Sequence, residues 1–315
     1  MHAERESHGC TLHLVCGIVG VFAKSEEVEA RLGADLAAML VQLSDRGPDS
    51  AGVAFYRDEA PPGSTKVTLY SADPGEDWGV VAAALREALG GAGEPAVRAT
   101  HACILVEADA DEVERWAVDA RPDLRVMSAG RMIEVYKEVG RPEAFARQFT
   151  LDDVRGTHAL GHTRMATESR VTTEASHPFS TGLDVCLVHN GSLSNHNRLR
   201  LALRREGIPF RTDNDTEVAA GYLAWRMREG ATLEQALEGC LDDLDGFYTF
   251  LVGTADGFAV LRDPIACKPA VLAETDDWVA MASEYRAIAV LPGAEDARVW
   301  EPSPGVVYAW ERVAA

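Results

Sequence analysis

The feature that most constrains the fold is the way in which strand-like segments are grouped. Segments rich in β-branched and aromatic residues follow one another in runs, and helices lie between the runs instead of after every strand. These segments are residues 16–22, 51–56, 184–190, 247–254, 258–263, 268–274, 278–283 and 306–310. A doubly wound parallel sheet needs a regular alternation of strands and helices, which this sequence lacks. The pattern therefore predicts an α+β protein in which two antiparallel sheets pack between helices.

Several helices have recognisable starts. Ser25 is followed by two glutamates and by apolar residues at helical spacing. Thr232 and Gln235 have the spacing of a capping box, in which two side chains bond reciprocally to backbone N–H groups of the first helical turn. Asn214 and Glu217 have the same spacing and predict a second capping box.

The middle of the chain has a different order of elements. Residues 71–149 pass through a helix and a Gly/Pro-rich break, and then through a strand, a helix and a strand. We predict a small inserted α+β module here, so that the main domain consists of residues 16–70 and 150–315. The module is either a packing or subunit-contact element, which we favour, or a ligand-binding regulatory domain.

Composition and charge exclude several classes of function. The 315 residues are 47% hydrophobic and 25% charged, which suffices for a full apolar core, and the formal net charge is −20. Because no basic block offsets this charge, binding to a nucleic-acid backbone is electrostatically opposed. No apolar run approaches the ~20 residues that span a bilayer, and the first ten residues do not resemble a signal peptide. We therefore expect a cytoplasmic protein with no membrane partner.

Six cysteines are scattered along the chain without a C-x-x-C pair. This spacing argues against a disulfide framework, a zinc site or an iron–sulfur cluster, so we expect no metal and no cofactor in this chain. Most of the cysteines are expected to be small buried apolar residues. Cys16 heads an apolar, glycine-spaced strand, where it is either another such residue or a nucleophile.

Of four polar groups next to these elements, Arg46 has a structural explanation, and the other three each have a structural and a chemical one. Arg46 begins an R-G-P-D-S segment that is typical of an ordinary turn. Arg164 ends a strand, where its planar fork either makes a surface ion pair or grips a carboxylate. Asn190 and Gly191 are either turn residues or a side-chain amide and a backbone N–H aimed at one oxyanion. Asp215 either stabilises a helix start or binds an ammonium group.

Taken together, these groups match one kind of substrate. A thiol, an Asn-Gly pair, an arginine and an aspartate complement an electrophilic carbonyl, an α-carboxylate and an α-amine. The set predicts attack on the side-chain carbonyl of an amino acid. A chain-terminal cysteine needs no histidine base, because its own α-amine, with a reference pKa near ~7.7–8.0, can take the thiol proton.

Five motifs, in this order, resemble the class II glutamine amidotransferases, which are N-terminal-nucleophile (Ntn) hydrolases. They are CGIVGVF from residue 16, RGPDSAG from residue 46, GHTRMAT from residue 161, HNGSLSN from residue 189 and TDNDTEV from residue 212. The resemblance covers residues 16–55 and 156–283. It implies the four-layer αββα sandwich of these hydrolases, with the module as an insertion.

The resemblance also implies roles for individual residues. Cys16 would be the nucleophile, and Asn190 with Gly191 would form the oxyanion hole. Arg164 would bind the α-carboxylate of L-glutamine, and Asp215 would bind its α-amine.

Two further residues, Arg46 and Thr167, would lie near the glutamine pocket. The segments GHTRMATES, LDDLDG and LRDPIACKP look most like the stand-alone amidotransferase subunits related to glutamate synthase and N-methylglutamate synthase. Met165 and Glu168 stand where amidophosphoribosyltransferase and glucosamine-6-phosphate synthase often carry Trp and His. The chain ends soon after the hydrolase core, so we expect a glutaminase subunit that releases glutamate and passes ammonia to a partner synthase subunit.

Two other functions stay open. One is a non-catalytic, glutamine-sensing regulatory subunit that keeps the pocket, and the other is an Ntn hydrolase that acts on a different amide. The α-amine mechanism also requires Cys16 to be the first residue, whereas fifteen residues precede it. We expect residues 1–15 to be a leader or propeptide that is removed, or the true start to be Val15 encoded by a GTG codon.

Overall fold

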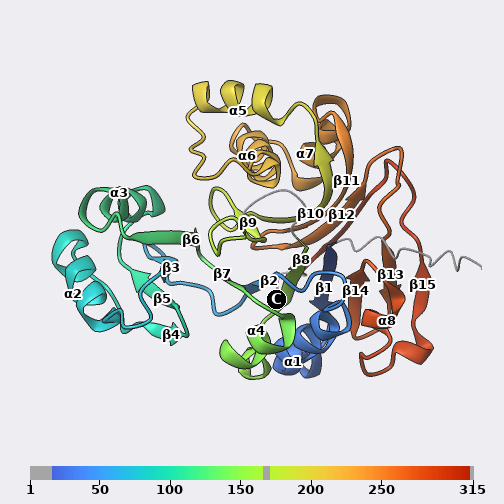
Figure 1. The fold of residues 1–315 in the computed structure, drawn as a ribbon, viewed down its shortest axis with the longest axis horizontal. Helices are drawn as coiled ribbons and strands as arrows, with labels where there is room; N and C mark the ends of the chain where they lie inside the picture. The colour runs from blue at the N-terminus through green and yellow to red at the C-terminus, as the bar shows by residue number, and fades with distance from the viewer. Residues whose placement is uncertain (1–15, 166–170, 313–315) are drawn as a thin grey trace, which may run out of the picture.

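The computed structural model describes residues 16–165 and 171–312, which form a four-layer sandwich with a smaller sheet beside it (Figure 1). Two antiparallel sheets lie face to face, and helices cover the outer face of each. The predicted α+β class and the αββα order of layers are confirmed. Residues 1–15 and Thr167 lie outside the described residues.

The larger sheet has seven strands, all paired antiparallel, with β1 near its middle. In spatial order these strands are β15 (Arg298–Trp300), β13 (Val271–Glu274), β14 (Trp278–Ala282), β1 (Gly17–Ala23), β8 (His158–Arg164), β2 (Ser50–Tyr56) and β7 (Ile133–Val139). In the ladder of β1 with β8, Gly17 lies opposite Thr163. The start of β1 therefore lies beside the end of β8.

The facing sheet has five strands. In spatial order they are β16 (Val307–Glu311), β12 (Gly257–Arg262), β11 (Gly246–Gly253), β10 (Cys186–Leu193) and β9 (Phe179–Ser180). The apolar core between the sheets includes Ile18 and Leu160 from the larger sheet and Val188 from the smaller one. Because side chains alternate across a strand, His162 and Asn190 point toward this same interface.

The outer faces of the two sheets are covered by different helices (Figure 1). The face of the larger sheet packs against α1 (Glu26–Gln42), α4 (Pro142–Gln148), α8 (Tyr285–Ile288) and the short 3₁₀ helices η1 (Leu151–Asp153) and η2 (Ala294–Asp296). The other sheet packs against α5 (His196–Arg205), α6 (Asp215–Arg228) and α7 (Leu233–Asp243).

The predicted helix starts differ in their capping. Thr232 and Gln235 form the predicted capping box at α7. Ser25 occupies the N-cap of α1, but its hydroxyl makes no capping bond. The box predicted for Asn214 and Glu217 is wrong: Asn214 caps Thr216 N, whereas the Glu217 carboxylate accepts bonds from the backbone N–H groups of residues 211 and 212.

A separate four-stranded sheet with two helices lies to the side of the sandwich, at the left of Figure 1. In chain order its elements are β3 (Thr65–Ser71), α2 (Trp78–Leu89), β4 (Ala96–Arg98), β5 (His101–Val106), α3 (Ala110–Ala120) and β6 (Leu124–Gly130). They have an apolar core of their own, with Val67, Leu85 and Ile104 at its centre. This sheet spans residues 65–130 and not 71–149, because β7 and α4 pack within the sandwich.

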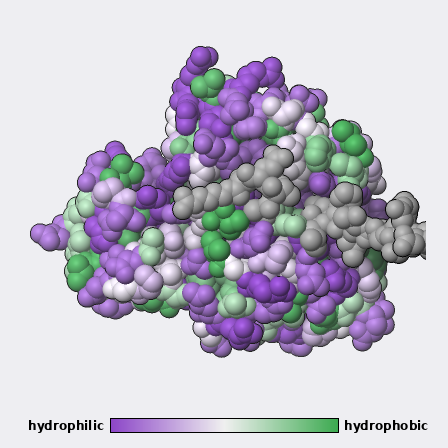
Figure 2. All heavy atoms as spheres, viewed as in Figure 1, coloured by the Kyte–Doolittle hydropathy of each residue, from purple (hydrophilic) through white to green (hydrophobic). Residues whose placement is uncertain are grey.

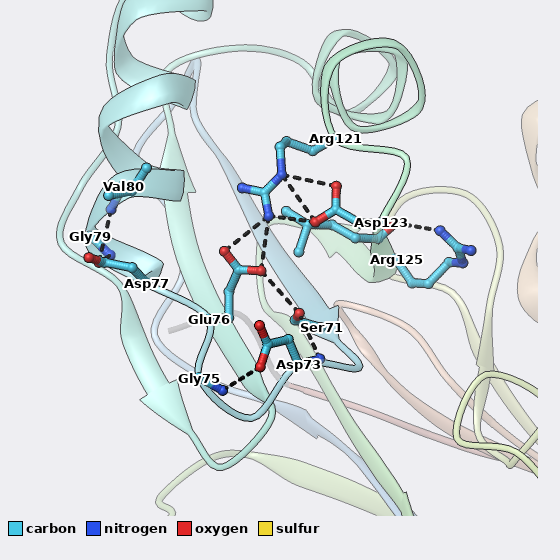
Figure 3. Close-up of polar contacts among 11 residues, drawn as sticks. Ser71, Asp73, Gly75, Glu76, Asp77, Gly79, Val80, Arg121, Asp123 and Arg125 are labelled. Carbon is cyan, nitrogen blue, oxygen red and sulfur yellow. Dashed lines mark hydrogen bonds and ion pairs between the residues drawn. The ribbon is translucent and has the colours of Figure 1, made fainter.

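A polar network closes one end of this module (Figure 3). The Glu76 carboxylate accepts two bonds from Arg121 Nη2, at 3.0 and 2.9 Å, and one from Ser71 Oγ at 3.0 Å. Arg121 also pairs with Asp123, and both carboxylates raise the pKa of its guanidinium. The network joins the end of β3, the loop before α2 and the segment between α3 and β6.

Asp184 ties the module to the sandwich. Its carboxylate is buried and accepts three backbone bonds from the turn between β6 and β7, from Arg131 N at 2.7 Å, Met132 N at 2.8 Å and Ile133 N at 3.0 Å. The backbone carbonyl of Asp184 accepts a further bond from Tyr56 Oη at 2.9 Å. Charge-assisted bonds of this kind are the stronger ones, so the junction is held firmly.

The surface agrees with the acidic composition. Figure 2 shows hydrophilic residues over most of one face, with hydrophobic residues in small separate groups. Within residues 16–165 and 171–312, no helix combines the length and the apolar character that crossing a membrane requires.

Candidate active site

Cys16 lies directly before β1 and is partly buried. Its Sγ accepts a bond from the backbone N–H of Met165 at 3.4 Å and lies 3.7 Å from the Met165 carbonyl oxygen. Burial raises the pKa of the Cys16 thiol, whereas the Met165 backbone and the charge of Arg164 lower it. A side chain at Gly17 would lie 2.7 Å from Thr163 Oγ1, which explains why glycine follows the cysteine.

The backbone carbonyl of Cys16 is held by two side chains from distant segments. Asn190 Nδ2 donates to it at 2.9 Å, and Arg46 Nε donates at 3.3 Å. The same Asn190 Nδ2 lies 3.2 Å from Ser283 Oγ, and Arg46 Nη1 forms an ion pair with Glu284. The structure thus brings three of the predicted site residues into direct contact.

Gly191 follows Asn190 in β10 at the point where the strand becomes exposed. Its φ is +150°, a value that favours glycine, and a Cβ there would lie 2.0 Å from the Phe247 carbonyl oxygen. No other residue fits this position without moving the backbone.

Arg164 is the last residue of β8 and is buried, with an exposed fraction of 8%. Its Nη1 donates to the Ala175 carbonyl at 3.2 Å, and its own carbonyl accepts a bond from Asp49 N at 3.1 Å. Arg164 lies two residues after His162 and Cys16 two residues before Ile18, and His162 and Ile18 are opposite each other, so both side chains are on the inner face of the larger sheet. The charge of Arg164 lowers the pKa of the Cys16 thiol.

Asp215 begins α6 and joins that helix to the end of β10. Its Oδ2 accepts a bond from Leu193 N at 2.9 Å, and its Oδ1 lies 3.4 Å from Thr216 Oγ1 and 3.8 Å from His189 Nδ1. The carboxylate is therefore bonded to Leu193, two residues after Gly191 in β10, and it fixes the start of α6 to the end of that strand. Its side chain keeps an exposed fraction of 23%.

Three buried histidines, two of them in the motifs, have no role in the sequence analysis. The His162 and His177 rings stack at 4.1 Å between centroids, and His177 Nδ1 accepts a bond from His189 N at 3.4 Å. The Thr216 hydroxyl links His177 to His189. Its Oγ1 lies 3.3 Å from His177 Nε2 and 3.0 Å from His189 Nδ1. His162 is in the GHTR motif and His189 is in the HNG motif, and these positions were the signal from which the sequence could have indicated a role for them.

Ser283 and Glu284 were also missed, because Ser283 ends a predicted strand and Glu284 follows it in an unremarkable A-S-E segment. Of the other cysteines in the described part of the chain, Cys103, Cys186 and Cys240 are buried as expected, and Cys267 is exposed. Burial raises the pKa of Cys103 and of Cys186 to about 12, so these thiols stay protonated near neutral pH.

Comparison with known proteins gives a consistent result. Residues 162–290 match a family described as a glutamine amidotransferase domain. The chain is 55% identical over 301 residues to the glutamine amidotransferase-like protein GlxB of Rhizobium meliloti, a match that covers 94% of this chain and 98% of that protein. It is 31% identical over 320 residues to a putative glutamine amidotransferase of Methanothermobacter thermautotrophicus, covering 94% and 100% of the two chains.

Solved structures show the same fold. The glutamine phosphoribosylpyrophosphate amidotransferase from B. subtilis matches with a TM-score of 0.60 and 22% identity, over 94% of this chain and 47% of that chain. A structure described as the allosteric regulatory enzyme of purine biosynthesis matches with a TM-score of 0.57 and 21% identity over the same shares. The chain thus spans about half the length of these two proteins.

Proposed function

The chain belongs to the class II glutamine amidotransferases, and on this premise we propose that it hydrolyses L-glutamine to glutamate and ammonia through a thioester on Cys16. The observation that carries the proposal is that Asn190 Nδ2 donates to the Cys16 carbonyl, while Met165, the residue after Arg164, donates its backbone N–H to the Cys16 sulfur. In the proposed reaction the thiolate attacks the side-chain amide, ammonia leaves, and water then hydrolyses the thioester.

The nucleophile needs a base, because burial raises the pKa of the Cys16 thiol. We propose that the base is the α-amine of Cys16 itself, with a reference pKa near ~7.7–8.0, once residues 1–15 are absent. The amine takes the thiol proton and returns it to the departing ammonia. Loss of a leader, or a start at Val15, would expose this amine.

Asn190 and Gly191 are the proposed oxyanion hole. Asn190 Nδ2 already lies 2.9 Å from the Cys16 carbonyl oxygen, so it can reach the oxygen of a tetrahedral intermediate formed on the sulfur of the same residue. The backbone N–H of Gly191, a residue that is exposed in β10, is the proposed second donor. Loss of one such donor typically lowers the rate by about 10²–10³-fold.

Arg164 is the proposed partner of the glutamine α-carboxylate, and Asp215 is the proposed partner of the α-amine. The burial of Arg164 supports this role, because a desolvated guanidinium binds a carboxylate more strongly than an exposed one. Arg46 and Thr167 are proposed to line the pocket.

We further propose that the ammonia is consumed by a partner synthase subunit of the glutamate synthase or N-methylglutamate synthase kind, in the cytoplasm. Every helix and strand in the described part of the chain belongs to the sandwich or to the four-stranded module. The module, proposed as a separate inserted domain, is a candidate contact for that partner.

The test is ammonia release from L-glutamine by the purified chain, with and without the proteins that co-purify with it. We expect hydrolysis that a Cys16→Ala variant abolishes while glutamine binding, measured by calorimetry, persists. Intact-mass measurement of the active enzyme should show that its first residue is Cys16. A fully active protein that retains residue 1 would contradict the α-amine mechanism.

The same experiment separates the alternatives. Glutamine binding without ammonia release would indicate a sensing subunit that keeps the pocket but has no free Cys16 amine. Hydrolysis of another amide that survives an Arg164→Ala substitution would indicate an Ntn hydrolase of different specificity.

A further inference from the structure

Two buried polar atoms at the interface between the sheets lack a hydrogen bond of good geometry within residues 16–165 and 171–312. They are Oδ1 of Asn190 and Nε2 of His162. Asn190 has an exposed fraction of 2% and His162 of 1%, so bulk water does not satisfy either atom. Buried polar atoms are normally hydrogen-bonded, so Asn190 Oδ1 as acceptor and His162 Nε2 as donor, on facing strands, are candidate partners for each other.

The fold brings these two side chains toward each other. His162 and Leu160 lie on the same face of β8, and Asn190 and Val188 lie on the same face of β10. Leu160 and Val188 belong to the apolar core between the sheets, so the polar pair continues this core toward the site. In the larger sheet His162 lies opposite Ile18, two residues beyond Cys16.

The orientation of the Asn190 amide is set at its nitrogen end. Nδ2 donates to the Cys16 carbonyl at 2.9 Å and lies 3.2 Å from Ser283 Oγ, so the oxygen end points away from the nucleophile. A flipped amide would put two carbonyl oxygens against each other, which is unfavourable. The oxygen end therefore needs a donor on the side away from Cys16.

His162 can supply that donor as a neutral ring. Burial lowers its pKa to about 3, although the His189 carbonyl and the Asn190 side chain are near enough to oppose this effect. A neutral imidazole carries one N–H, which can be on Nε2. The stacked His177 ring, at 4.1 Å between centroids and 21° between planes, limits rotation of His162.

We infer that His162 is a positioning residue whose Nε2–H donates to Asn190 Oδ1 and keeps the Asn190 Nδ2–H group directed at the oxyanion. This inference rests on the proposed glutaminase function. A donor at the oxygen end also polarises the amide and strengthens its N–H bonds. The glutamine substrate itself is held by other groups, so His162 should affect kcat and not KM.

The experiment compares His162→Met with His162→Gln in the full chain, with kcat and KM for glutamine and the free energy of unfolding measured for each. We expect His162→Met to lower kcat about 10–100-fold, a part of the loss expected for removing the oxyanion donor, with KM within about threefold. His162→Gln places an amide N–H near the position of Nε2 and should restore most of kcat.

His158→Met is the matched control. His158 is on the same face of β8, is fully buried, and has its pKa lowered to about 3 by burial. However, its Nε2 donates to the Thr254 carbonyl at 2.9 Å, away from the site. We expect this control to lose stability and to keep kcat.

Three results would overturn the inference: an unchanged kcat in His162→Met, equal losses in His162→Met and His162→Gln, or a matching loss of kcat in His158→Met. If His162→Met does not fold, His162→Asn replaces it, because its amide is too short to reach Asn190 and should show the same loss of kcat. An inactive wild-type enzyme would contradict the proposed function, whereas an active one with normal His162 variants would contradict the positioning role alone.

Discussion

Replacing Gly191 with alanine tests the proposed oxyanion hole directly. A Cβ at this position would lie 2.0 Å from the Phe247 carbonyl oxygen and 2.8 Å from the Tyr248 Cα, both of which are backbone atoms of β11. Since real Cβ atoms stay at least 3.0 Å from such atoms, the strands must separate locally by about 1 Å. A displacement of about 1 Å in a catalytic group can lower the rate about 10²-fold.

Steady-state ammonia release from glutamine is the assay. We expect Gly191→Ala to lower kcat at least about 10²-fold, because the displaced N–H no longer reaches the oxyanion, while glutamine still binds. Gly207→Ala is the matched control, since Gly207 also has a positive φ, +83°, but no atom lies within 4 Å of a Cβ built there. This control should lose about 1–2 kcal/mol of stability, because alanine disfavours a positive φ, and it should keep its activity.

A folded Gly191→Ala enzyme with wild-type kcat would refute the assignment of this N–H. If the variant does not fold, Asn190→Ala tests the other donor. Its removal leaves the Cys16 carbonyl bonded to Arg46 Nε at 3.3 Å, so the fold should persist while kcat falls about 10²–10³-fold.

Two further predictions concern stability. Glu76→Gln removes the charge that pairs with Arg121, so protection from hydrogen exchange in residues 65–130 should fall by about 1–3 kcal/mol, and unaltered exchange there would contradict this. Burial lowers the pKa of His101, His158 and His162 to about 3. Below about pH 6.5 these histidines therefore bind protons in the unfolded chain but not in the folded one. The free energy of unfolding is highest above that pH and falls as the pH is lowered toward 3, by up to ~1.4 kcal/mol per pH unit for each histidine. Urea unfolding between about pH 7 and 4.5 should show this loss and a shallower one for His158→Gln, whereas identical slopes would refute it.

The order of layers was predictable from the sequence because it depends on local patterns. Runs of β-branched and aromatic residues mark strands, and the spacing of Thr232 and Gln235 marks a helix start that the structure confirms. The limits of the module were less predictable. β7 resembles the strands before it, and only its pairing with β2, seen in the ladder of Val53 with Tyr136, assigns it to the sandwich.

The contacts within the site were not predictable, because they join residues far apart in the chain. Asn190 and Cys16 are 174 positions apart, and Arg46 and Glu284 are 238 apart. A motif gives the identity of such residues but not the partner of each atom. Glu217 is an example. It is three residues after the N-cap Asn214, as a capping box requires, yet its carboxylate accepts bonds from the backbone of the preceding loop.

Strand direction explains why motifs from distant parts of the chain meet at one edge. β8 runs antiparallel to β1, so Arg164, which ends β8, lies beside Cys16, which precedes β1. Parallel strands would put these two residues at opposite edges of the sheet. The facing strand β10 then contributes Asn190 from across the interface. Because side chains alternate along each strand, a shift of β8 by one residue would turn Arg164 and His162 toward α1 and away from the nucleophile.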